Sequence, residues 1–246
     1  MKNILFQKRF YRGWVNAKDL HEARFVEKET DLQISTNKKL DLDFVKERIH
    51  ALRWEIETYI EKDRRFLVAL KPIVVELHAP ALIKDMAEAA KKANVGPMAT
   101  VAGAVAQFLG EGLIKKGYKD VIIENGGDLF IKTTKTRVVG IYAGRSKIWN
   151  RLGLKIKPAM TPVSVCASSG TIGHSLSFGS ADSVIILSKD AALADAMATA
   201  TANRINSKKD LQPALDFARS VKGVLGVVII LKNNLISWGC VEFENT

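Results

Sequence analysis

The stretch AALADAMATATAN, residues 191–203, constrains the fold of this chain more than any other. Alanine favours the helix, so the stretch predicts a helix, although its side chains bury little bulk. Because most helical stability in proteins comes from tertiary packing, other elements must lie close against this thin helix. Two interpretations of its one acid, Asp195, stay open: it lies at the solvent edge of a packed helix, or it faces a ligand.

On the second interpretation, Asp195 and Thr199 form a pair of metal ligands. Residues four apart lie on one face of a helix, one turn from each other. A carboxylate and a hydroxyl supply the hard oxygen atoms that Mg²⁺ prefers, and Mg²⁺ usually keeps several waters and binds substrate phosphates as well. This spacing therefore predicts Mg²⁺ held by Asp195 and Thr199 against a phosphate.

Helical and strand-like segments alternate along the 246 residues without a strict strand–helix–strand rhythm. This pattern predicts an α+β fold, a mixed β-sheet with helices packed on it. We expect a single domain over residues 1–246, and leave open whether residues 1–75 form a loosely separate N-terminal part. Helices are predicted over residues 42–63, 80–94, 97–116, 191–203 and 211–221. Strand-like runs are predicted over residues 24–36 (an irregular pair), 65–77 (two runs broken at Pro72), 121–123, 129–132, 136–144, 223–231 and 235–243, and residues 162–188 are read as a strand, a Gly/Ser-rich loop and a second strand.

Charge and cysteine content limit the classes of protein that this chain can represent. Two cysteines fit a reducing compartment, and the first residues carry no apolar signal segment, so we expect a cytoplasmic protein without a membrane partner. The apolar residues 95–114 are better explained by a tightly packed helix than by a membrane span. The net charge is +11, and residues 129–181 contain no acid, so this basic stretch could attract phosphates.

Two glycine-rich segments follow predicted strands. Asn125, Gly126, Gly127 and Asp128 fit a plain hairpin turn, or a turn that lets a ligand approach the backbone. Ser168, Ser169 and Gly170 open a loop whose hydroxyls and amides could bind an anion, although the P-loop pattern is absent. Cys166 and His174, eight residues apart, could form a catalytic pair, whereas a buried structural cysteine is the alternative reading.

In their order along the chain, Gly126-Gly127-Asp128, Ser168-Ser169-Gly170 and Ala194–Thr199 (ADAMAT) resemble the motifs of the ApbE family, whose members transfer FMN from FAD to a protein threonine. The resemblance covers residues 95–201 and is closest to the short, cytoplasmic, uncharacterised branch of that family. It implies an ApbE-like fold, FAD as ligand or substrate, and Mg²⁺ held by Asp195 and Thr199 against the diphosphate. It departs at Ala102 and Gln107, where the transferases carry a lysine and an aspartate, and the H-x-x-D-P segment is not recognisable.

Three functions therefore compete. The first is Mg²⁺-dependent binding of a flavin nucleotide or another anionic diphosphate, with FMN transfer as its fullest form. The second is an enzyme of the same fold that acts through Cys166 on a small anionic metabolite, either a sulfur compound or another anion. The third is a nucleic-acid-binding module built on the basic stretch, which ranks last because charge alone needs neither the Gly-Gly-Asp nor the Ala-Asp-Ala element. A homo-oligomer is compatible with all three.

Overall fold

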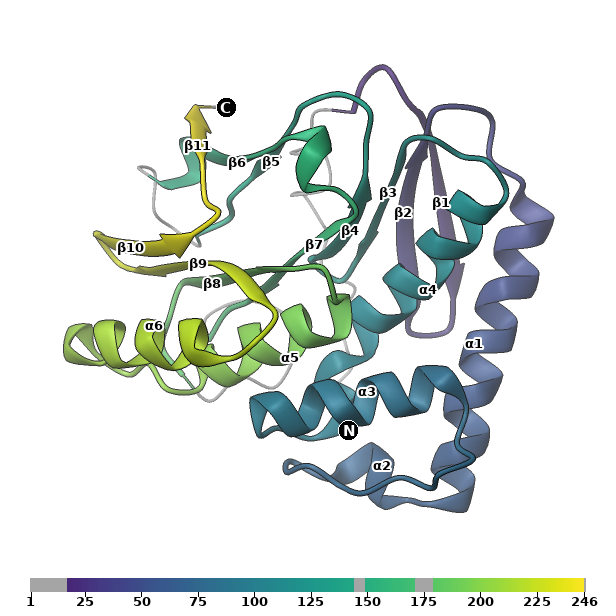
Figure 1. Ribbon diagram of the computed structural model, residues 1–246, viewed down its shortest axis with the longest axis horizontal. Coiled ribbons are helices and arrows are strands. Elements are labelled where there is room, and N and C mark those ends of the chain that lie inside the picture. The colour runs from purple at the N-terminus through teal and green to yellow at the C-terminus, as the bar shows by residue number, and fades with distance from the viewer. Residues whose placement is uncertain (1–16, 144–148, 171–178, 246) are drawn as a thin grey trace.

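The computed structural model describes residues 17–143, 149–170 and 179–245. These residues form six α-helices and eleven strands (Figure 1). The helices are α1 (Leu42–Lys62), α2 (Arg65–Val68), α3 (Ala81–Ala93), α4 (Val101–Lys115), α5 (Ala191–Ala202) and α6 (Leu211–Ser220), with short 3₁₀ turns η2 (Pro97–Thr100), η3 (Trp149–Arg151), η4 (Pro158–Met160) and η5 (Lys208–Asp210). The strands are β1 (His21–Glu27), β2 (Thr30–Thr36), β3 (Val121–Asn125), β4 (Asp128–Lys132), β5 (Arg137–Gly140), β6 (Leu152–Ile156), β7 (Val163–Ser168), β8 (Ser183–Ser188), β9 (Val224–Leu231), β10 (Asn234–Gly239) and β11 (Phe243–Asn245).

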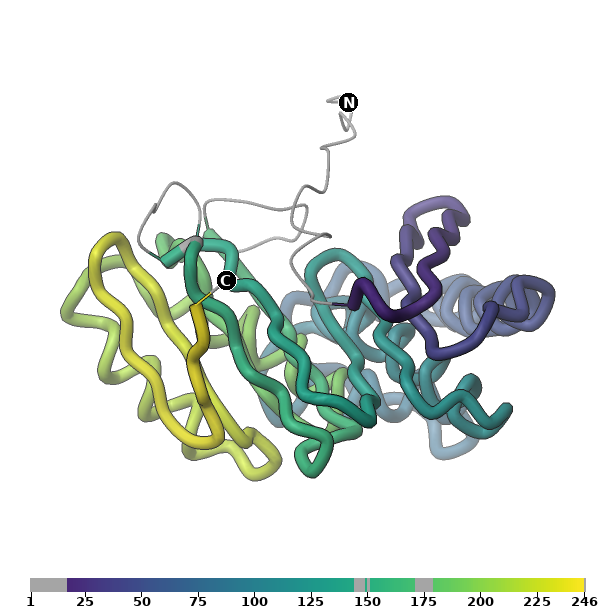
Figure 2. The backbone as a smooth tube through the Cα atoms, turned by 90° about the horizontal axis from the view of Figure 1, so that it is seen from above, coloured from purple at the N-terminus to yellow at the C-terminus, as the bar shows by residue number. Residues whose placement is uncertain are grey.

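The main sheet has eight strands in the order β1-β2-β3-β4-β7-β8-β9-β10, and each neighbouring pair is antiparallel. A second sheet has the order β11-β6-β5. Figures 1 and 2 show helices α3 to α6 on one face of the main sheet and the second sheet on the other face. The predicted α+β fold, a sheet with packed helices, is confirmed.

The central strands are buried on both faces, which explains their continuous apolar runs. Along β8 the side chains of Val184 and Ile186 belong to the core under the helices. The alternate side chains of Ile185 and Leu187 belong to the core under the second sheet. The sheet thus separates two apolar cores, and the helix-side core holds the small residues of α5.

Two strand predictions are wrong. Residues 65–77 form the short helix α2 and then run outside α3 without joining a sheet, with Val74 and Leu77 exposed (Figure 1). The apolar pattern there resembled a strand, but no sheet edge lies beside it. The predicted strand over 235–243 is split: the chain leaves the main sheet at Gly239, whose φ is +83°, and returns as β11 in the second sheet.

The apolar residues 95–114 lie almost entirely in the 3₁₀ turn η2 and the helix α4, which follow each other without a break. Within the described ranges, Pro97–Lys115 is the one helix long and apolar enough to cross a membrane by length and composition, and half of its apolar window is buried. Helix α4 contacts β3, β4 and α5, and Leu109 and Leu113 are fully buried. These are the contacts of a core helix in a globular fold.

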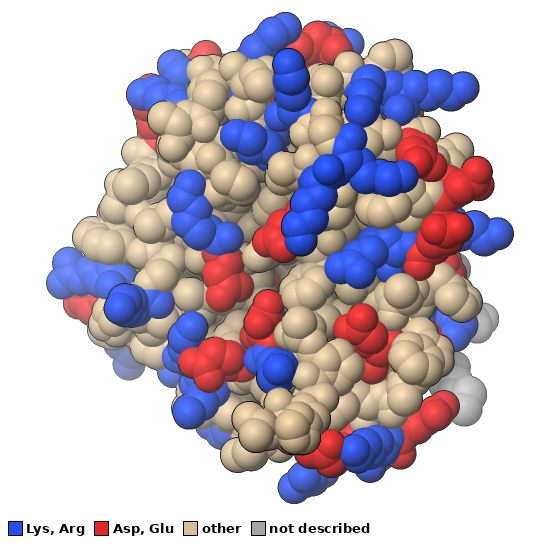
Figure 3. Space-filling model, turned by 45° about the vertical axis from the view of Figure 1, so that its right-hand side comes forward, with Lys and Arg blue, Asp and Glu red and all other residues tan. Residues whose placement is uncertain are grey.

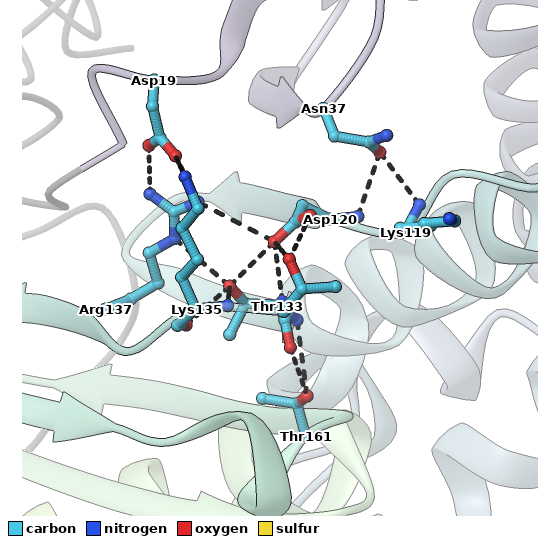
Figure 4. A network of polar contacts seen from close by, with 9 residues as sticks. Asp19, Asn37, Lys119, Asp120, Thr133, Lys135, Arg137 and Thr161 are labelled. Carbon is cyan, nitrogen blue, oxygen red and sulfur yellow. Dashed lines mark hydrogen bonds and ion pairs between the residues drawn. The ribbon is translucent and has the colours of Figure 1, made fainter.

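A buried polar network joins β3, β4 and β5 to the segment that precedes β1 (Figure 4). The Asp120 carboxylate accepts hydrogen bonds from the Thr134 amide (2.7 Å) and the Thr133 hydroxyl (3.0 Å). The Arg137 guanidinium lies 3.8 Å from Asp120 and also pairs with Asp19. Burial alone raises the pKa of Asp120, but these hydrogen bonds outweigh burial and lower it.

Lysines of the acid-free stretch, residues 129–181, form ion pairs with acids from other parts of the chain. Lys155 pairs with Glu242 (3.4 Å) and Glu244 (3.2 Å), and Lys135 pairs with Asp19 (3.0 Å). On the face shown in Figure 3, blue and red side chains are interspersed. The sequence around Lys135 and Lys155 therefore suggested more net positive charge than the folded protein has there, because acids from distant segments pair with these lysines.

We predict that the Asp120 network stabilises the fold above about pH 4 and loses this contribution as the pH falls. A carboxylate whose pKa is lowered by folding adds stability above its unfolded pKa, about 3.9 for Asp, and that stability is lost as it becomes protonated. Thermal unfolding followed by circular dichroism should show Asp120→Asn destabilised by about 1–3 kcal/mol at neutral pH. The wild-type protein should then lose more stability than the variant on acidification.

The exposed Asp43→Asn in the first turn of α1 is the matched control, and it should behave as the wild type does. Equal acid sensitivity of the wild type and Asp120→Asn would contradict the role assigned to the network.

Candidate functional site

The Asn125–Asp128 segment is the two-residue turn of the β3–β4 hairpin. Gly126 and Gly127 have φ of +68° and +107°, a region that side chains other than glycine rarely adopt. The hairpin reading is therefore correct. The flanking Asn125 and Asp128 are nevertheless buried, and the Asn125 amide donates to the Ala102 carbonyl at the start of α4 (3.1 Å).

Asp128 ties the hairpin to the neighbouring strand β7. Its Oδ1 accepts a hydrogen bond from the Ala167 amide at 3.2 Å. Ala167 directly precedes Ser168 at the end of β7. The Gly-Gly-Asp and Ser-Ser-Gly segments, about forty residues apart in sequence, therefore lie side by side at the ends of the central strands β4 and β7.

Helix α5 brings Asp195 to the same region. The helix begins after Asp190, whose carboxylate accepts the Leu193 amide (3.0 Å) as an N-terminal cap. One turn further on, Asp195 Oδ2 accepts the Gly103 amide of α4 at 3.0 Å. A Cβ on Gly103 would lie 2.3 Å from the Ala191 carbonyl oxygen, so only glycine permits this approach of the two helices.

Burial changes the protonation of both carboxylates, and the charge of Asp195 also acts on Asp128. Burial raises the pKa of Asp195 to about 7, against the opposing effect of hydrogen bonds from the Gly103 and Ala102 amides. Burial, followed by the nearby charge of Asp195, raises the pKa of Asp128. Burial thus disfavours the ionised form of both carboxylates, and a bound cation would favour it.

Thr199 lies one turn beyond Asp195 on α5 and is buried. Among the described residues, no group of three or more His, Cys, Asp or Glu side chains could hold a metal ion. A metal at Asp195 and Thr199 would therefore take its other ligands from water or from a bound anion, the arrangement typical of Mg²⁺. The metal-ligand role of the two residues stays a prediction.

The helix-facing row of β7 consists of small polar side chains: Ser164, Cys166 and Ser168, all buried. Cys166 lies 3.7 Å from the Ala191 carbonyl, and burial, followed by the charge of Asp128, raises the pKa of its thiol. A thiol in such surroundings is protonated and poorly accessible, which favours packing over nucleophilic attack. The hydroxyls of Ser164 and Ser168 have no hydrogen-bond partner among the described residues.

The loop after Ser168 is closed tightly at its base. The Gly170 amide donates to the Ala181 carbonyl (2.9 Å), and a Cβ on Gly170 would lie 1.8 Å from the Gly179 carbonyl oxygen. Ser169 and Gly170 are half-buried at this base. His174, proposed as a catalytic residue, lies outside the described residues.

The structure thus gathers Asn125, Asp128, Cys166, Ser168 and Asp195 around the start of α4. Sequence reasoning gave no structural role to Gly103 or Gln107 of α4, which contact α5 directly. The one available signal was the glycine itself, since an isolated glycine within a helix often marks a close packing contact.

Comparisons with known proteins identify the family and the fold of the chain. A family model described as "AbpE bacteria" matches residues 12–235. The UPF0280 protein of Methanocaldococcus jannaschii is 38% identical over 219 residues, which cover 87% of this chain and 88% of the relative. The UPF0280 protein of Methanothermobacter thermautotrophicus is 42% identical over 183 residues, covering 72% of this chain and 71% of the relative.

Among solved structures, the apo flavinyl transferase ApbE of Pseudomonas stutzeri superposes with a TM-score of 0.59 at 10% identity, covering 89% of this chain and 94% of that one. The ApbE protein of Thermotoga maritima gives a TM-score of 0.56 at 15% identity, covering 92% and 97%. At these identities the likeness shows the fold alone. The resemblance to the ApbE family and the ApbE-like fold inferred from the sequence are both confirmed.

We predict that one cysteine of the native protein reacts with iodoacetamide and the other does not. Cys240 is exposed, whereas Cys166 is buried and has a raised thiol pKa. Mass spectrometry should find a single adduct, on Cys240, in the native protein and two adducts after denaturation. Comparable alkylation of both thiols in the native state would contradict the burial of Cys166 and revive its role as a nucleophile.

We also predict that Gly103→Ala destabilises the protein by about 1–3 kcal/mol, because its Cβ would collide with the backbone of α5. Gly112→Ala on the same helix is the matched control, since its Cβ would meet only the movable ring of Phe44 at 3.1 Å. That control should be neutral or stabilising, since alanine favours a helix interior more than glycine does. Urea denaturation of both variants measures the difference, and equal stabilities would contradict the close approach of α4 and α5.

Proposed function

The chain belongs to the family described as "AbpE bacteria", and from that premise we propose that it binds a flavin nucleotide through its diphosphate, together with Mg²⁺. FAD is the leading candidate, because the fold is that of proteins named as flavin transferases. The site proposed for the diphosphate lies between the hairpin turn of β3–β4, the end of β7 and helix α5.

One observation carries this proposal: the Asp128 carboxylate is buried beside the half-buried Asp195, whose negative charge adds to burial in raising the pKa of Asp128. A buried charge is costly unless it is paired or coordinates a metal. Backbone amides also fix the positions of both carboxylates: the Gly103 amide donates to Asp195, and the Ala167 amide donates to Asp128. Such a site suits a divalent cation, whose own charge reverses the local electrostatics.

Asp195 and Thr199 would hold the ion, with Asp128 adding negative charge beside them. A carboxylate and a hydroxyl are oxygen ligands, and Mg²⁺ completes its shell with water and phosphate oxygens. When bound, Mg²⁺ supplies charge neutralisation at the diphosphate and orients it for displacement.

The remaining residues of the site would bind and orient the ligand. The Ser168 hydroxyl is buried without a partner in the described part of the chain, so it is available to donate to a phosphate oxygen. The loop base at Ser169 and Gly170, closed by the hydrogen bond from the Gly170 amide to the Ala181 carbonyl, would lie beside the same ligand. FMN transfer to a protein hydroxyl is the fullest activity of such a site; the departures at Ala102 and Gln107 make it a separate question from binding.

The alternative functions are less well supported. The burial and raised pKa of Cys166 disfavour an enzyme that uses this thiol on a sulfur-containing metabolite. The ion pairs of Lys135 and Lys155 with acids from distant segments weaken the case for a nucleic-acid module. Cytoplasmic location and homo-oligomer formation remain predictions.

We predict that Asp195→Asn weakens Mg²⁺-dependent binding of FAD by at least about tenfold, equivalent to about 1.4 kcal/mol. Asparagine keeps an oxygen that can accept the Gly103 amide but loses the charge that a cation requires. Isothermal titration calorimetry of FAD with MgCl₂, repeated with EDTA, measures the effect. Asp43→Asn on α1, remote from the site, should bind as the wild type does. An unchanged affinity in Asp195→Asn would exclude this residue as the metal ligand.

A further inference from the structure

We propose that Gln107 is a positioning residue that fixes α5 along α4 and thereby sets the place of the Asp195 carboxylate. The inference rests on the proposed function, because Asp195 is its metal ligand. The supporting feature is a pair of contacts between the two helices, which we call the reciprocal cap: Gln107 with Ala191, and Asp195 with Gly103.

The first contact satisfies the beginning of α5. Ala191 is the first residue of that helix, so its amide has no acceptor within the helix. The Gln107 Oε1 atom accepts this amide at 2.7 Å. The Asp190 carboxylate accepts the Leu193 amide in the same turn, so Gln107 and Asp190 each accept one of the free amides at the start of α5.

The orientation of the Gln107 amide is set by Glu111, one turn further along α4. Gln107 Nε2 donates to Glu111 Oε1 at 2.8 Å, which leaves Oε1 facing α5. An amide held at both ends has little rotational freedom. The Gln107–Ala191 contact is therefore a defined geometric link between the helices.

The second contact satisfies the beginning of α4. Thr100 precedes this helix and makes no side-chain cap, and the Gly103 amide in its first turn is instead accepted by Asp195. A carboxylate at a helix N-terminus is stabilised by the partial positive charge there. Asp195 thus accepts a free amide at the start of α4, as Gln107 does, beside the N-cap Asp190, at the start of α5.

The spacing makes the two contacts interdependent. Gly103 and Gln107 are one turn apart on α4, and Ala191 and Asp195 are one turn apart on α5, in opposite chain directions. Sliding one helix along the other would break both contacts at once. Gly103 permits this close packing, since the Ala191 carbonyl occupies the space that a Cβ would need.

Loss of the Gln107 amide would therefore release the first turn of α5 and, with it, Asp195. Asp128 would stay in place, because the Ala167 amide of β7 holds it independently. The distance between the two carboxylates would no longer be fixed, and the affinity for a cation bound beside them would fall even in a fully folded protein.

Three variants test the proposal. Gln107→Ala removes the contact. The double variant Gln107→Glu with Glu111→Gln exchanges the donor and the acceptor while keeping an oxygen at position 107 for the Ala191 amide. Gln212→Ala on α6 is the matched control: Gln212 also donates to an acid four residues on, Asp216, but it is exposed and is not part of the reciprocal cap.

Two readouts are needed. The first is the concentration of Mg²⁺ that half-saturates binding at a fixed FAD concentration; we expect about a tenfold increase in Gln107→Ala, within the 10–100-fold typical of residues that orient metal ligands. The second is hydrogen exchange of the Gly103 amide by NMR without ligand, which should accelerate in the same variant. The double variant should restore both values, and Gln212→Ala should change neither.

The two proposals can fail separately. If wild-type protein does not bind FAD with Mg²⁺, the proposed function fails, and Gly103 exchange still decides whether Gln107 positions Asp195. Unchanged Gly103 exchange in Gln107→Ala would overturn the positioning role. The positioning role would also be overturned if Gln107→Ala lost much thermal stability while its folded fraction required the same Mg²⁺ concentration as the wild type. Gln107 would then contribute to the stability of the fold and not to the position of Asp195.

Discussion

The close approach of α5 to α4 and to β7 is the constraint on which the rest of the structure depends. Gly103 has no room for a Cβ against the Ala191 carbonyl, and the α5 side chains that face the core are mostly alanine. Because the backbones lie this close, a short acid such as Asp195 can reach the amides that begin α4. Larger residues on either helix would separate the carboxylate from its partner and open the packed core between them.

This closeness also creates the electrostatic character of the site. The same burial that packs the helices raises the pKa of Asp195 to about 7 and, together with Asp195, raises the pKa of Asp128. One amide at the start of α4 and one amide of β7 donate to these two carboxylates and favour their ionised forms. This is the physical reason for proposing a cation there, which Asp195 would bind while it also accepts an amide at the start of α4.

Much of the fold was predictable from local pattern. The alanine-rich helix, the amphipathic α1 and the hairpin at Gly126-Gly127 follow from helix propensity, apolar periodicity and positive φ. Residues 65–77 were mispredicted, because their apolar pattern does not reveal whether a sheet edge lies beside them. The site motifs were found through family resemblance, whereas the contacts of Gln107 and Gly103 depend on how two helices pack, which no local pattern encodes.

The central claim is that a divalent cation binds beside Asp195 against the diphosphate of a nucleotide. Crystals grown with FAD and Mn²⁺, which accepts the same oxygen ligands as Mg²⁺, test it directly by anomalous diffraction. The account predicts an anomalous peak within coordination distance of the Asp195 carboxylate and of a phosphate oxygen. Ordered FAD with no peak near Asp195, or a peak bound to a different part of the protein, would contradict it.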